Sequence, residues 1–548
     1  MLQPGQVDGN HWVGTLSSSA LATAIGIAAL QARDPEGCKD AIARGRRWLQ
    51  ETQLADGGWG DAVVDPSNIN STSLALAALV FTTPSSFQRA EGDRTLATVL
   101  ERGRARLHAM GGYEAVGDPK RCTLSGPCRT VSALAELMSW TRIKRLRPEV
   151  ILFPRRLTRT ISTTFPAYLS IATLHSTRAS DPRNLLPTYP LARRQAMAWL
   201  SRAQGPGGSF ELSAFLTALI IVCLSAAGLG DLPWLRRAFR FVLESQRPDG
   251  GWPIDRDLET FDTDLAVMAF RESGLRPPNA TAIRDWLRRR QFDSPCFPTG
   301  AAPGGWAWAM ADGWPDSDDT SFTLVALRTL GVRQDDPAIE RGSRWLEGMQ
   351  NRDGSWSTFV RNSRMPFDHD CPYITGHVLS ALNAAGRLHG ASRALDRALV
   401  YLERSQRDDG SFASIWFRAS TAGSASVVEA LSDCGLGAHR ITRAASEFLL
   451  RNQNPDGGWG GERGHDASTA EETSWALLAL LRGPIEDRRD SIQRGLDWLC
   501  RNQLADGTWS PWPVGLYYSA MWYSDSAYAL TLPIAALGRA RRVLAGGR

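Results

Sequence analysis

The sequence contains little lysine and little cysteine. Lys39, Lys120 and Lys144 are its only lysines, so the formal charge of +5 comes almost wholly from arginines scattered along the chain. Because these side chains do not gather in a block, the charge gives no support for nucleic-acid binding. Eight cysteines in 548 residues do not suggest a disulfide scaffold. Cys122 and Cys128 lie close together, but no second pair stands at zinc-ligand spacing, so we expect no metal site.

We expect neither a targeting leader nor a membrane span. The opening residues, MLQPGQVDGNHW, have neither a basic segment nor an apolar core, which favours a cytoplasmic protein. The stretch 212–230 carries no charge and approaches the length of a membrane span. It includes Ser213, Thr217 and Ser225 and occupies a repeat position, so we interpret it as a buried inner helix. The mildly basic surface still suits peripheral contact with anionic lipid, or a diphosphate substrate.

One segment recurs along the chain, with the pattern Gln-x-x-Asp-Gly-x-Trp. Copies occupy 53–59, 246–252, 350–356, 406–412, 453–459 and 503–509, and a degenerate copy occupies 204–210. Where consecutive copies are adjacent, their glutamines lie 42 to 56 residues apart. Internal repeats of this period indicate stacked helical pairs.

Each copy separates an amphipathic helix from an apolar one. The first helix ends in Trp-Leu or an equivalent, as at Trp48-Leu49, and an apolar segment such as 72–79 follows after a polar loop. The Asp-Gly pair ends the first helix because glycine accepts positive φ and aspartate favours turns. Alternating outer and inner helices predict an all-α fold built from α/α barrels. We expect the repeated glutamine and tryptophan to tie neighbouring helices together, and we assign them no catalytic role.

The acidic cluster Asp316-Ser317-Asp318-Asp319 is the main candidate for chemistry. Three carboxylates within four residues repel one another if all are ionised, so they must share protons or find cationic partners. Such a cluster is more often a solvated loop or a helix N-cap than a site. Here it follows Gly304-Gly305-Trp306 and precedes an apolar helix at 322–327, inside the repeat frame, which favours a functional role.

Together, the repeats and Asp316-Ser-Asp-Asp-Thr320 resemble the squalene–hopene cyclase and oxidosqualene cyclase family of class II terpene cyclases. The likeness extends over nearly the whole chain, and further segments follow the family's order: His11-Trp12-Val-Gly, Pro148–Pro154, Pro303-Gly-Gly-Trp-Ala-Trp308, Thr375-Gly-His377 and Leu537-Gly-Arg539. The resemblance implies two α/α barrels, the β and γ domains of this class, with the active cavity between them. It implies a catalytic barrel made of 1–19 plus 255–548, and an inserted barrel at 20–254.

The resemblance also implies a reaction and the residues that perform it. Asp318 protonates the terminal alkene of a linear isoprenoid, while Asp316 and Asp319 orient it and stabilise the carboxylate left behind. His377 hydrogen-bonds this cluster and helps to return a proton to Asp318 through water. Tyr373 stands where the family usually has an aspartate, which leaves the charge state of His377 open. Protonation of this kind requires no cofactor.

Aromatic side chains are expected around the carbocations that follow, because aromatic faces attract cations. The resemblance implies six cavity aromatics: Phe261, Trp308, Phe359, Trp416, Tyr517 and Tyr528. The chain also departs from the family, since Met521 and Asp525 stand where aromatics usually serve the later rings. This departure favours a product with fewer rings.

Three substrates fit these observations. The first is a C15 or C20 prenyl diphosphate, cyclised to a bicyclic drimane- or labdane-type diphosphate. Arg159, Arg361 and Arg364 are then candidates for binding the diphosphate near the entrance, since arginine binds phosphate bidentately. Magnesium is compatible with such a substrate, although the chain has no Asp-Asp-x-x-Asp motif to ionise it. The alternatives are squalene, cyclised by an enzyme docked on a membrane, and an aromatic compound bearing a prenyl chain.

Two non-cyclase classes share the α/α barrel. The β subunits of protein prenyltransferases need an Asp/Cys/His zinc set, which this sequence does not assemble. Trp-rich glycosidases use separated carboxylates with tryptophans that stack on sugars, whereas the tryptophans here follow a structural repeat. Both classes therefore explain the sequence less well than a cyclase.

Overall fold

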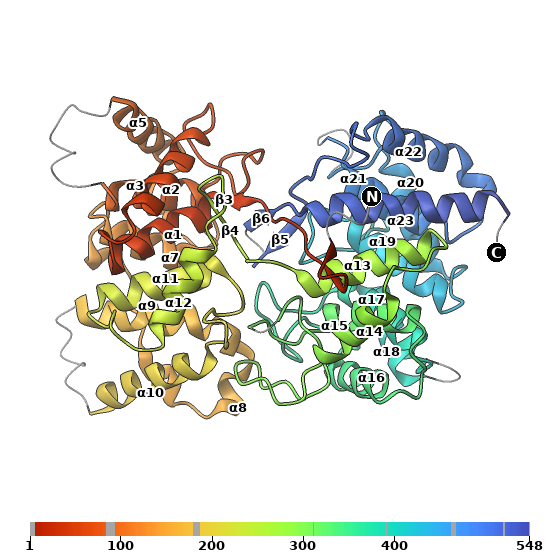
Figure 1. Ribbon diagram of the computed structural model, residues 1–548, viewed down its shortest axis with the longest axis horizontal. Coiled ribbons are helices and arrows are strands. Elements are labelled where there is room, and N and C mark those ends of the chain that lie inside the picture. The colour runs from red at the N-terminus through yellow and green to blue at the C-terminus, as the bar shows by residue number, and fades with distance from the viewer. Residues whose placement is uncertain are drawn as a thin grey trace.

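The computed structural model describes residues 6–83, 94–178, 187–310, 312–388, 392–461, 467–518 and 521–546. Helices dominate this part of the chain, and its short strands form two-stranded antiparallel ladders, β1–β2, β3–β4 and β5–β6. The all-α class predicted from the repeats is confirmed. Figure 1 shows two helical bodies side by side, with β5 and β6 between them.

The first body contains β3 (Ser18–Ser19), α1 (Ala20–Arg33), α2 (Lys39–Glu51), α3 (Ile69–Phe81), α5 (Arg94–Ala109), α6 (Gly112–Val116), α7 (Ser125–Leu134), η1 (Trp140–Arg142), η2 (Pro148–Leu152), α8 (Arg155–Thr158), η3 (Arg159–Thr164), α9 (Phe165–Arg178), α10 (Thr188–Ala203), α11 (Ala214–Ala226), α12 (Leu235–Glu244) and β4 (Trp252–Pro253). Its inner helices α1, α3, α7, α9 and α11 pack in a closed ring. The first two strands, β1 (Gln6–Val7) and β2 (His11–Trp12), lie against the second body, where β2 packs on α13 (Glu259–Glu272).

The second body contains α13 (Glu259–Glu272), α14 (Ala280–Arg289), α15 (Ser317–Thr329), α16 (Pro337–Met349), α17 (Pro372–Ala384), α18 (Arg393–Ser405), α19 (Thr421–Asp433), α20 (Arg440–Arg451), α21 (Ala470–Leu480), η5 (Glu486–Arg488), α22 (Arg489–Arg501), β5 (Gly515–Tyr517), β6 (Met521–Tyr523) and α23 (Ser526–Leu544). Here α13, α15, α17, α19, α21 and α23 form the inner ring, which closes where α23 packs on α13.

The two rings have different burial inside and outside. Inner helices such as α11 are buried on every side, whereas outer helices such as α18 bury only one face. The uncharged stretch 212–230 is therefore an inner helix, as its repeat position predicts. Across the described residues, no helix is both long and apolar enough to cross a membrane.

The repeated glutamine and tryptophan bind main-chain carbonyls, which confirms their predicted structural role. The Trp356 indole donates to the Leu346 carbonyl at 2.7 Å, and the Gln350 amide donates to Gly354 and Ala394 at 2.9 Å each. The same pattern holds at the other tryptophan copies. It holds also at Gln291 and Trp306, a copy that the sequence pattern missed because a longer loop separates its two ends.

The repeat glycine is required by the turn and by a close neighbour. Gly354 has φ +102°, and a Cβ there would lie 2.1 Å from the Arg397 carbonyl oxygen. A side chain at this position would therefore strain the backbone and collide with the next outer helix.

We propose that residues 20–254 form one domain and that 1–19 with 255–548 form the other. The two boundaries fall in β3 and just after β4, which pair with each other through Ser18–Pro253 and Ser19–Trp252. The chain thus leaves the second body and returns to it at one place, as expected for an insertion.

Candidate active site

The site lies where the inner helices of the second ring begin. A cavity there is lined by Leu16, Ile254, Asp255, Leu258, Phe261, Trp308, Asp316, Asp318, Asp319, Thr358, Phe359, Trp416, Phe417, Tyr517, Tyr523 and Tyr528. Many of these residues stand in the first turn of an inner helix or in the loop before it. The loops that follow the repeats therefore converge on one cavity. The volume of this cavity that is accessible to water is about 70 Å³.

The acidic motif forms the start of α15. The Asp316 side chain caps this helix, accepting hydrogen bonds from the backbone N–H groups of Asp318 and Asp319 at 2.8 Å each. The backbone N–H of Asp316 donates to the Trp306 carbonyl at 3.0 Å. Thus the repeat tryptophan fixes the capping residue, and the cap fixes the first turn. The structure gives the motif the N-cap geometry and also buries it, whereas a solvated loop would leave it in water.

Burial favours the protonated form of two of the three aspartates. It raises the pKa of Asp316 to about 7, and it raises the pKa of Asp319 well above its usual range. The charge of Asp316 raises the pKa of Asp319 further, and that of Asp264 adds to the effect. One carboxyl oxygen of Asp316 and one of Asp319 have no other hydrogen-bond partner among the described residues. The pair is therefore arranged to share protons.

Asp318 differs from its neighbours, because it pairs with His377. The Nδ1 atom of His377 lies 2.6 Å from Asp318 Oδ1, and the Asp318 side chain is 11% exposed while facing the cavity. His377 comes from α17, and its ring is held edge-on by Phe322 at 4.5 Å and Tyr373 at 4.2 Å. The aromatic ring of Tyr373 thus occupies the side of His377 where the resemblance implies an aspartate.

All six predicted aromatics line the same cavity as Asp318. Phe359 lies 5.8 Å from Trp308 and 6.0 Å from Trp416, measured between ring centroids, and Phe261 lies 5.7 Å from Tyr528. These rings contact one another edge-on, so the cavity is bounded by ring faces and edges.

The three predicted arginines do not line this cavity. Arg361 and Arg364 are exposed in the loop after Trp356, and Arg159 is exposed on η3 of the first body. Arg159 lines a different pocket and donates to the Gly300 carbonyl at 3.1 Å.

The sequence reasoning missed an acidic side of the cavity. Asp255 is 2% exposed, lines the cavity, and has one carboxyl oxygen without a partner among the described residues. Burial raises its pKa well above the usual range. Behind it, the buried Glu211 accepts a hydrogen bond from the Tyr518 hydroxyl. No local pattern marks Asp255, since it follows a structural repeat by three residues.

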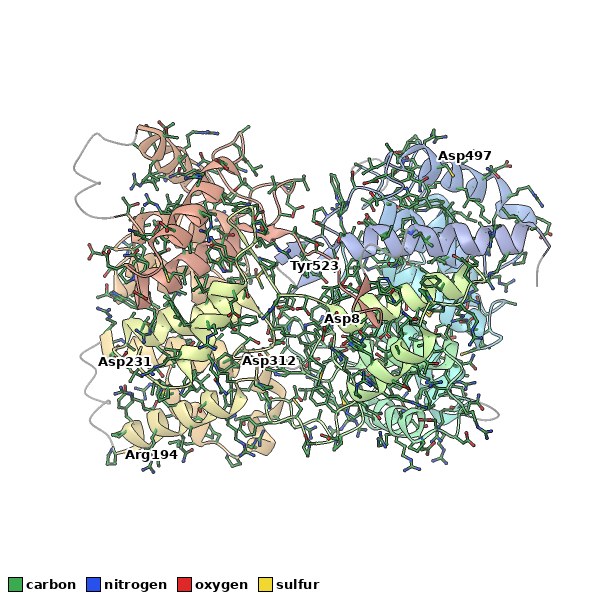
Figure 2. All side chains as sticks on the ribbon, in the orientation of Figure 1. Asp8, Arg194, Asp231, Asp312, Asp497 and Tyr523 are labelled. Carbon is green, nitrogen blue, oxygen red and sulfur yellow. The ribbon has the colours of Figure 1, made fainter. Side chains whose placement is uncertain are left out.

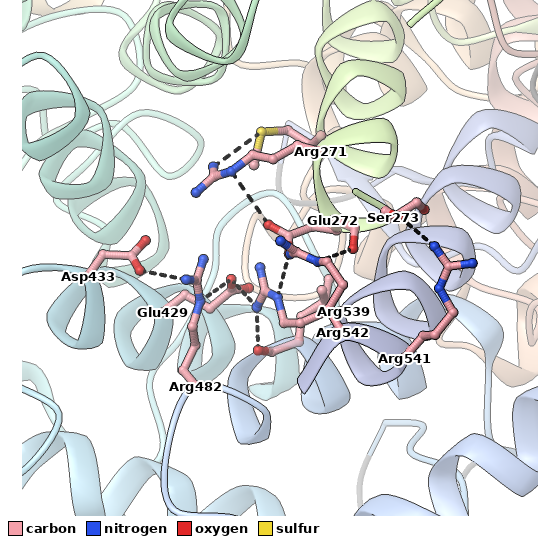
Figure 3. Close-up of polar contacts among 11 residues, drawn as sticks. Arg271, Glu272, Ser273, Glu429, Asp433, Arg482, Arg539, Arg541 and Arg542 are labelled. Carbon is pink, nitrogen blue, oxygen red and sulfur yellow. Dashed lines mark hydrogen bonds and ion pairs between the residues drawn. The ribbon is translucent and has the colours of Figure 1, made fainter. Parts of the chain in front are cut away.

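A second chamber lies inside the ring, behind His377. It shares Phe261, Phe417 and Tyr528 with the cavity, and its volume accessible to water is about 330 Å³. Its far wall is an ion network in which Arg539 donates to Glu272 at 2.8 Å and to Glu429 at 2.7 Å (Figure 3). These contacts hold the pKa of Glu272 at about 2. The chamber thus has a charged far wall, whereas the cavity in front is mostly apolar.

No group of three or more His, Cys, Asp or Glu side chains in the described ranges is placed to hold a metal ion. All eight cysteines are free, and Cys122 and Cys128 are both buried. Class II cyclases act by protonation and need no cofactor for that step.

Comparison with known protein families agrees with this geometry. The squalene-hopene cyclase C-terminal domain matches residues 258–542, and the squalene-hopene cyclase N-terminal domain matches residues 1–166. The chain belongs to the squalene–hopene cyclase family of class II terpene cyclases, which are enzymes.

Individual relatives fall into two groups. The chain is 25% identical to a squalene–hopene cyclase of Alicyclobacillus acidocaldarius over 98% of this chain and 96% of that protein. It is 30% identical to a drimenyl diphosphate synthase of Streptantibioticus cattleyicolor over 56% of this chain and 58% of that protein. Against several further relatives the chain spans only 43–46% of their length. Among solved structures, an ent-copalyl diphosphate synthase from Streptomyces platensis shares the fold, with a TM-score of 0.62, 20% identity, and 96% of both chains covered.

Proposed function

We propose that this protein cyclises a linear isoprenoid after Asp318 protonates its terminal alkene. The observation that carries the proposal is the Asp318–His377 pair at 2.6 Å, facing a cavity walled by aromatic rings. The substrate we favour is a C15 or C20 prenyl diphosphate, which closes to a bicyclic drimane- or labdane-type diphosphate.

An alkene is a very weak base, so the acid must release its proton easily into a dry space. Asp318 Oδ1 accepts a hydrogen bond from His377 Nδ1–H, which stabilises the carboxylate formed when the other oxygen gives up its proton. The N-terminus of α15 favours the same charge, because Asp318 stands in the first turn of this helix. Protons shared between Asp316 and Asp319 reduce the negative charge beside it, since burial raises the pKa of both. Proton return from the chamber behind His377 completes the cycle.

The carbocation then meets the aromatic side chains. Trp308, Phe359 and Trp416 form a continuous series of edge-on contacts along the cavity, and a cation near a ring face is stabilised by ~1–2 kcal/mol in such a dry site. We favour a C15 or C20 chain, which closes fewer rings, over a C30 chain. The positions of Met521 and Asp525, which lack aromatic rings, support the same choice.

Two relatives named drimenyl diphosphate synthase support a diphosphate substrate. Arg159, Arg361 and Arg364 are the candidates from the sequence for binding the diphosphate. Magnesium, if bound with the substrate, would offset the charge of the diphosphate, and it has no part in the protonation step.

Squalene is the second candidate, because the match to the Alicyclobacillus squalene–hopene cyclase covers nearly both chains. A prenylated aromatic compound has no separate observation in its favour. The two leading candidates differ in whether the product keeps a diphosphate, which is directly measurable.

The test is a parallel incubation of the purified protein with farnesyl diphosphate, geranylgeranyl diphosphate and squalene, with and without Mg²⁺. Asp318→Asn, which keeps the shape but cannot donate the proton, is the control. Products are identified by mass spectrometry before and after phosphatase. Bicyclic alcohols that appear only after phosphatase, and not with the Asp318→Asn variant, support the proposal. Cyclised squalene would replace the favoured substrate, and equal products from the variant would remove Asp318 from the mechanism.

A further inference from the structure

A second pocket, which we call the arginine pocket, lies where the two bodies meet. It is lined by Arg155 of α8, Arg159 of η3, Arg202 of α10 and the segment around Phe297 in the loop before α15. Its volume accessible to water is about 540 Å³. Arg155 and Arg159 are four residues apart, which puts them on one face of the chain where it coils helically. The loop belongs to the second body and the arginines to the first, so the pocket exists only in the assembled fold.

The positive charges of the arginine pocket have no acidic partner in it. None of the residues that line it is Asp or Glu. Arg155 donates to the Phe297 carbonyl at 2.5 Å, and Arg159 donates to the carbonyls of Thr299 and Gly300 at 3.3 and 3.1 Å. Carbonyl groups orient a guanidinium group but do not neutralise it. Each arginine also keeps N–H donors beyond these bonds, because a guanidinium group carries five.

Two of the guanidinium groups lie over one aromatic ring. The Cζ atoms of Arg155 and Arg202 are 4.7 and 4.2 Å from the centroid of Phe297, so the two charges are at most about 9 Å apart. Like charges at this distance repel each other, and an anion that contacts both guanidinium groups offsets this repulsion. The ring itself is fixed, because it packs at 5.6 Å on Trp199, which packs at 5.5 Å on Phe165. The arginines are therefore held in place before any ligand arrives, which lowers the entropy cost of binding.

We propose that the arginine pocket binds a phosphate-bearing head group. Planar guanidinium groups bind phosphate oxygens in pairs, and three of them surround this pocket without competition from a carboxylate. Two sources carry this chemistry: the diphosphate of a prenyl substrate, and the head group of an anionic phospholipid. The first source rests on the proposed function and specifies where its substrate is held.

The surroundings of the pocket suit either source. Phe153, which also lines it, is 60% exposed, and an exposed aromatic ring beside arginines can contact acyl or prenyl chains. On the inner side, burial raises the pKa of Glu211 and the nearby charge of Asp255 raises it further; Glu211 in turn adds to the raised pKa of the buried Cys296. Asp255 lines the acid cavity and Cys296 precedes Phe297 in the loop, so a buried layer that contains Glu211 connects the cavity with the pocket.

The experiment uses the full chain and three variants. Arg155→Gln and Arg202→Gln each remove one charge over Phe297, while Arg194→Gln removes an exposed charge on the same helix as Arg202, outside the pocket, at the edge of the molecule in Figure 2. Calorimetry measures the binding of inorganic diphosphate. Sedimentation measures binding to vesicles of phosphatidylglycerol with phosphatidylcholine, and to vesicles of phosphatidylcholine alone. Kinetics with the prenyl diphosphate give KM and kcat.

We expect inorganic diphosphate to bind the wild type, and binding to weaken about ten-fold with Arg155→Gln or Arg202→Gln but not with Arg194→Gln. A rise in KM at constant kcat in the two pocket variants identifies the substrate as the source. Unchanged KM with weaker binding to the anionic vesicles identifies phospholipid.

The proposal is overturned if neither diphosphate nor anionic vesicles bind the wild type, or if all three variants behave alike. Its failure is separate from failure of the proposed function. Product formation that depends on Asp318 is measured in the same samples and does not require the arginine pocket to be the binding site.

Discussion

His377 offers a quantitative test of how the acid works. Its Nδ1 atom lies 2.6 Å from Asp318 Oδ1, and it lines the chamber behind the cavity, so the side chain acts on Asp318 and not on the substrate. Replacing it with phenylalanine keeps the ring contacts to Phe322 and Tyr373 but removes the hydrogen bond. A hydrogen bond to a charged group is worth about 1.5–3 kcal/mol, so kcat is expected to fall about 10- to 150-fold.

A second variant separates the hydrogen bond from the ring. His377→Asn places an amide N–H near the position of Nδ1, so it restores part of the interaction with Asp318. We expect the order wild type, His377→Asn, His377→Phe for kcat, with KM unchanged in both variants because neither alters the cavity wall. Steady-state product formation by mass spectrometry gives both constants, and thermal unfolding confirms that each variant is folded.

A kcat of His377→Phe within a factor of about three of the wild type would refute this role of His377. Loss of a charge-assisted hydrogen bond to Asp318 should lower kcat by more than that factor. The same role is also refuted if KM rises and kcat stays constant in both variants. That outcome would place His377 in substrate binding and leave Asp318 without a positioning partner.

Two further predictions concern stability. Burial raises the pKa of Asp316 to about 7, so the native state holds a proton that the unfolded chain releases above pH ~4. The free energy of unfolding should therefore fall as the pH rises from about 4 to 7. The contribution of this group to that fall is up to about 4 kcal/mol. Denaturant unfolding at a series of pH values should show a shallower fall for Asp316→Asn, and parallel curves would contradict this. Arg539 is 3% exposed and binds Glu272 and Glu429, so Arg539→Met leaves Glu272 with only Arg271 and Arg542, and Glu429 with only Arg482, as cationic partners. Loss of this buried charge should lower the free energy of unfolding by about 3 kcal/mol, the lower end of the range for breaking a buried ion pair. The exposed Arg541, which binds only the Ser273 carbonyl in Figure 3, provides the control Arg541→Met, for which we expect less than about 1 kcal/mol.

The repeats could be recognised in the sequence because their interactions join residues that are close along the chain. In each copy found from the sequence, four residues separate the glutamine from the glycine whose carbonyl it binds. In the copies that end in tryptophan, ten residues separate the tryptophan from its carbonyl partner, as at Trp459 and Leu449. The glycine φ follows from the same turn. Interactions within one turn leave a fixed spacing in the sequence, and so the fold class and the helix order could be predicted. The copy at Gln291 was missed because its loop is longer and the spacing no longer shows.

The geometry of the acid motif also depends partly on interactions between residues close along the chain. Asp316 caps the helix that carries Asp318 and Asp319, so three residues of sequence set the first turn of α15. Their protonation could not be predicted, because it depends on burial, and burial depends on how Asp264 and the neighbouring loops pack around the turn.

The sequence by itself determined the helical pairs, the turns between them and the start of α15, since each depends on residues a few positions apart. Only the tertiary structure decided which side chains meet. Phe261 and Tyr528 are 267 residues apart and contact each other because the inner ring closes, α23 packing on α13. Arg155 and Arg202 meet Phe297 because one body stands against the other. Contacts of this kind leave no spacing in the chain, because they depend on the curvature of a whole ring and on the packing of two bodies.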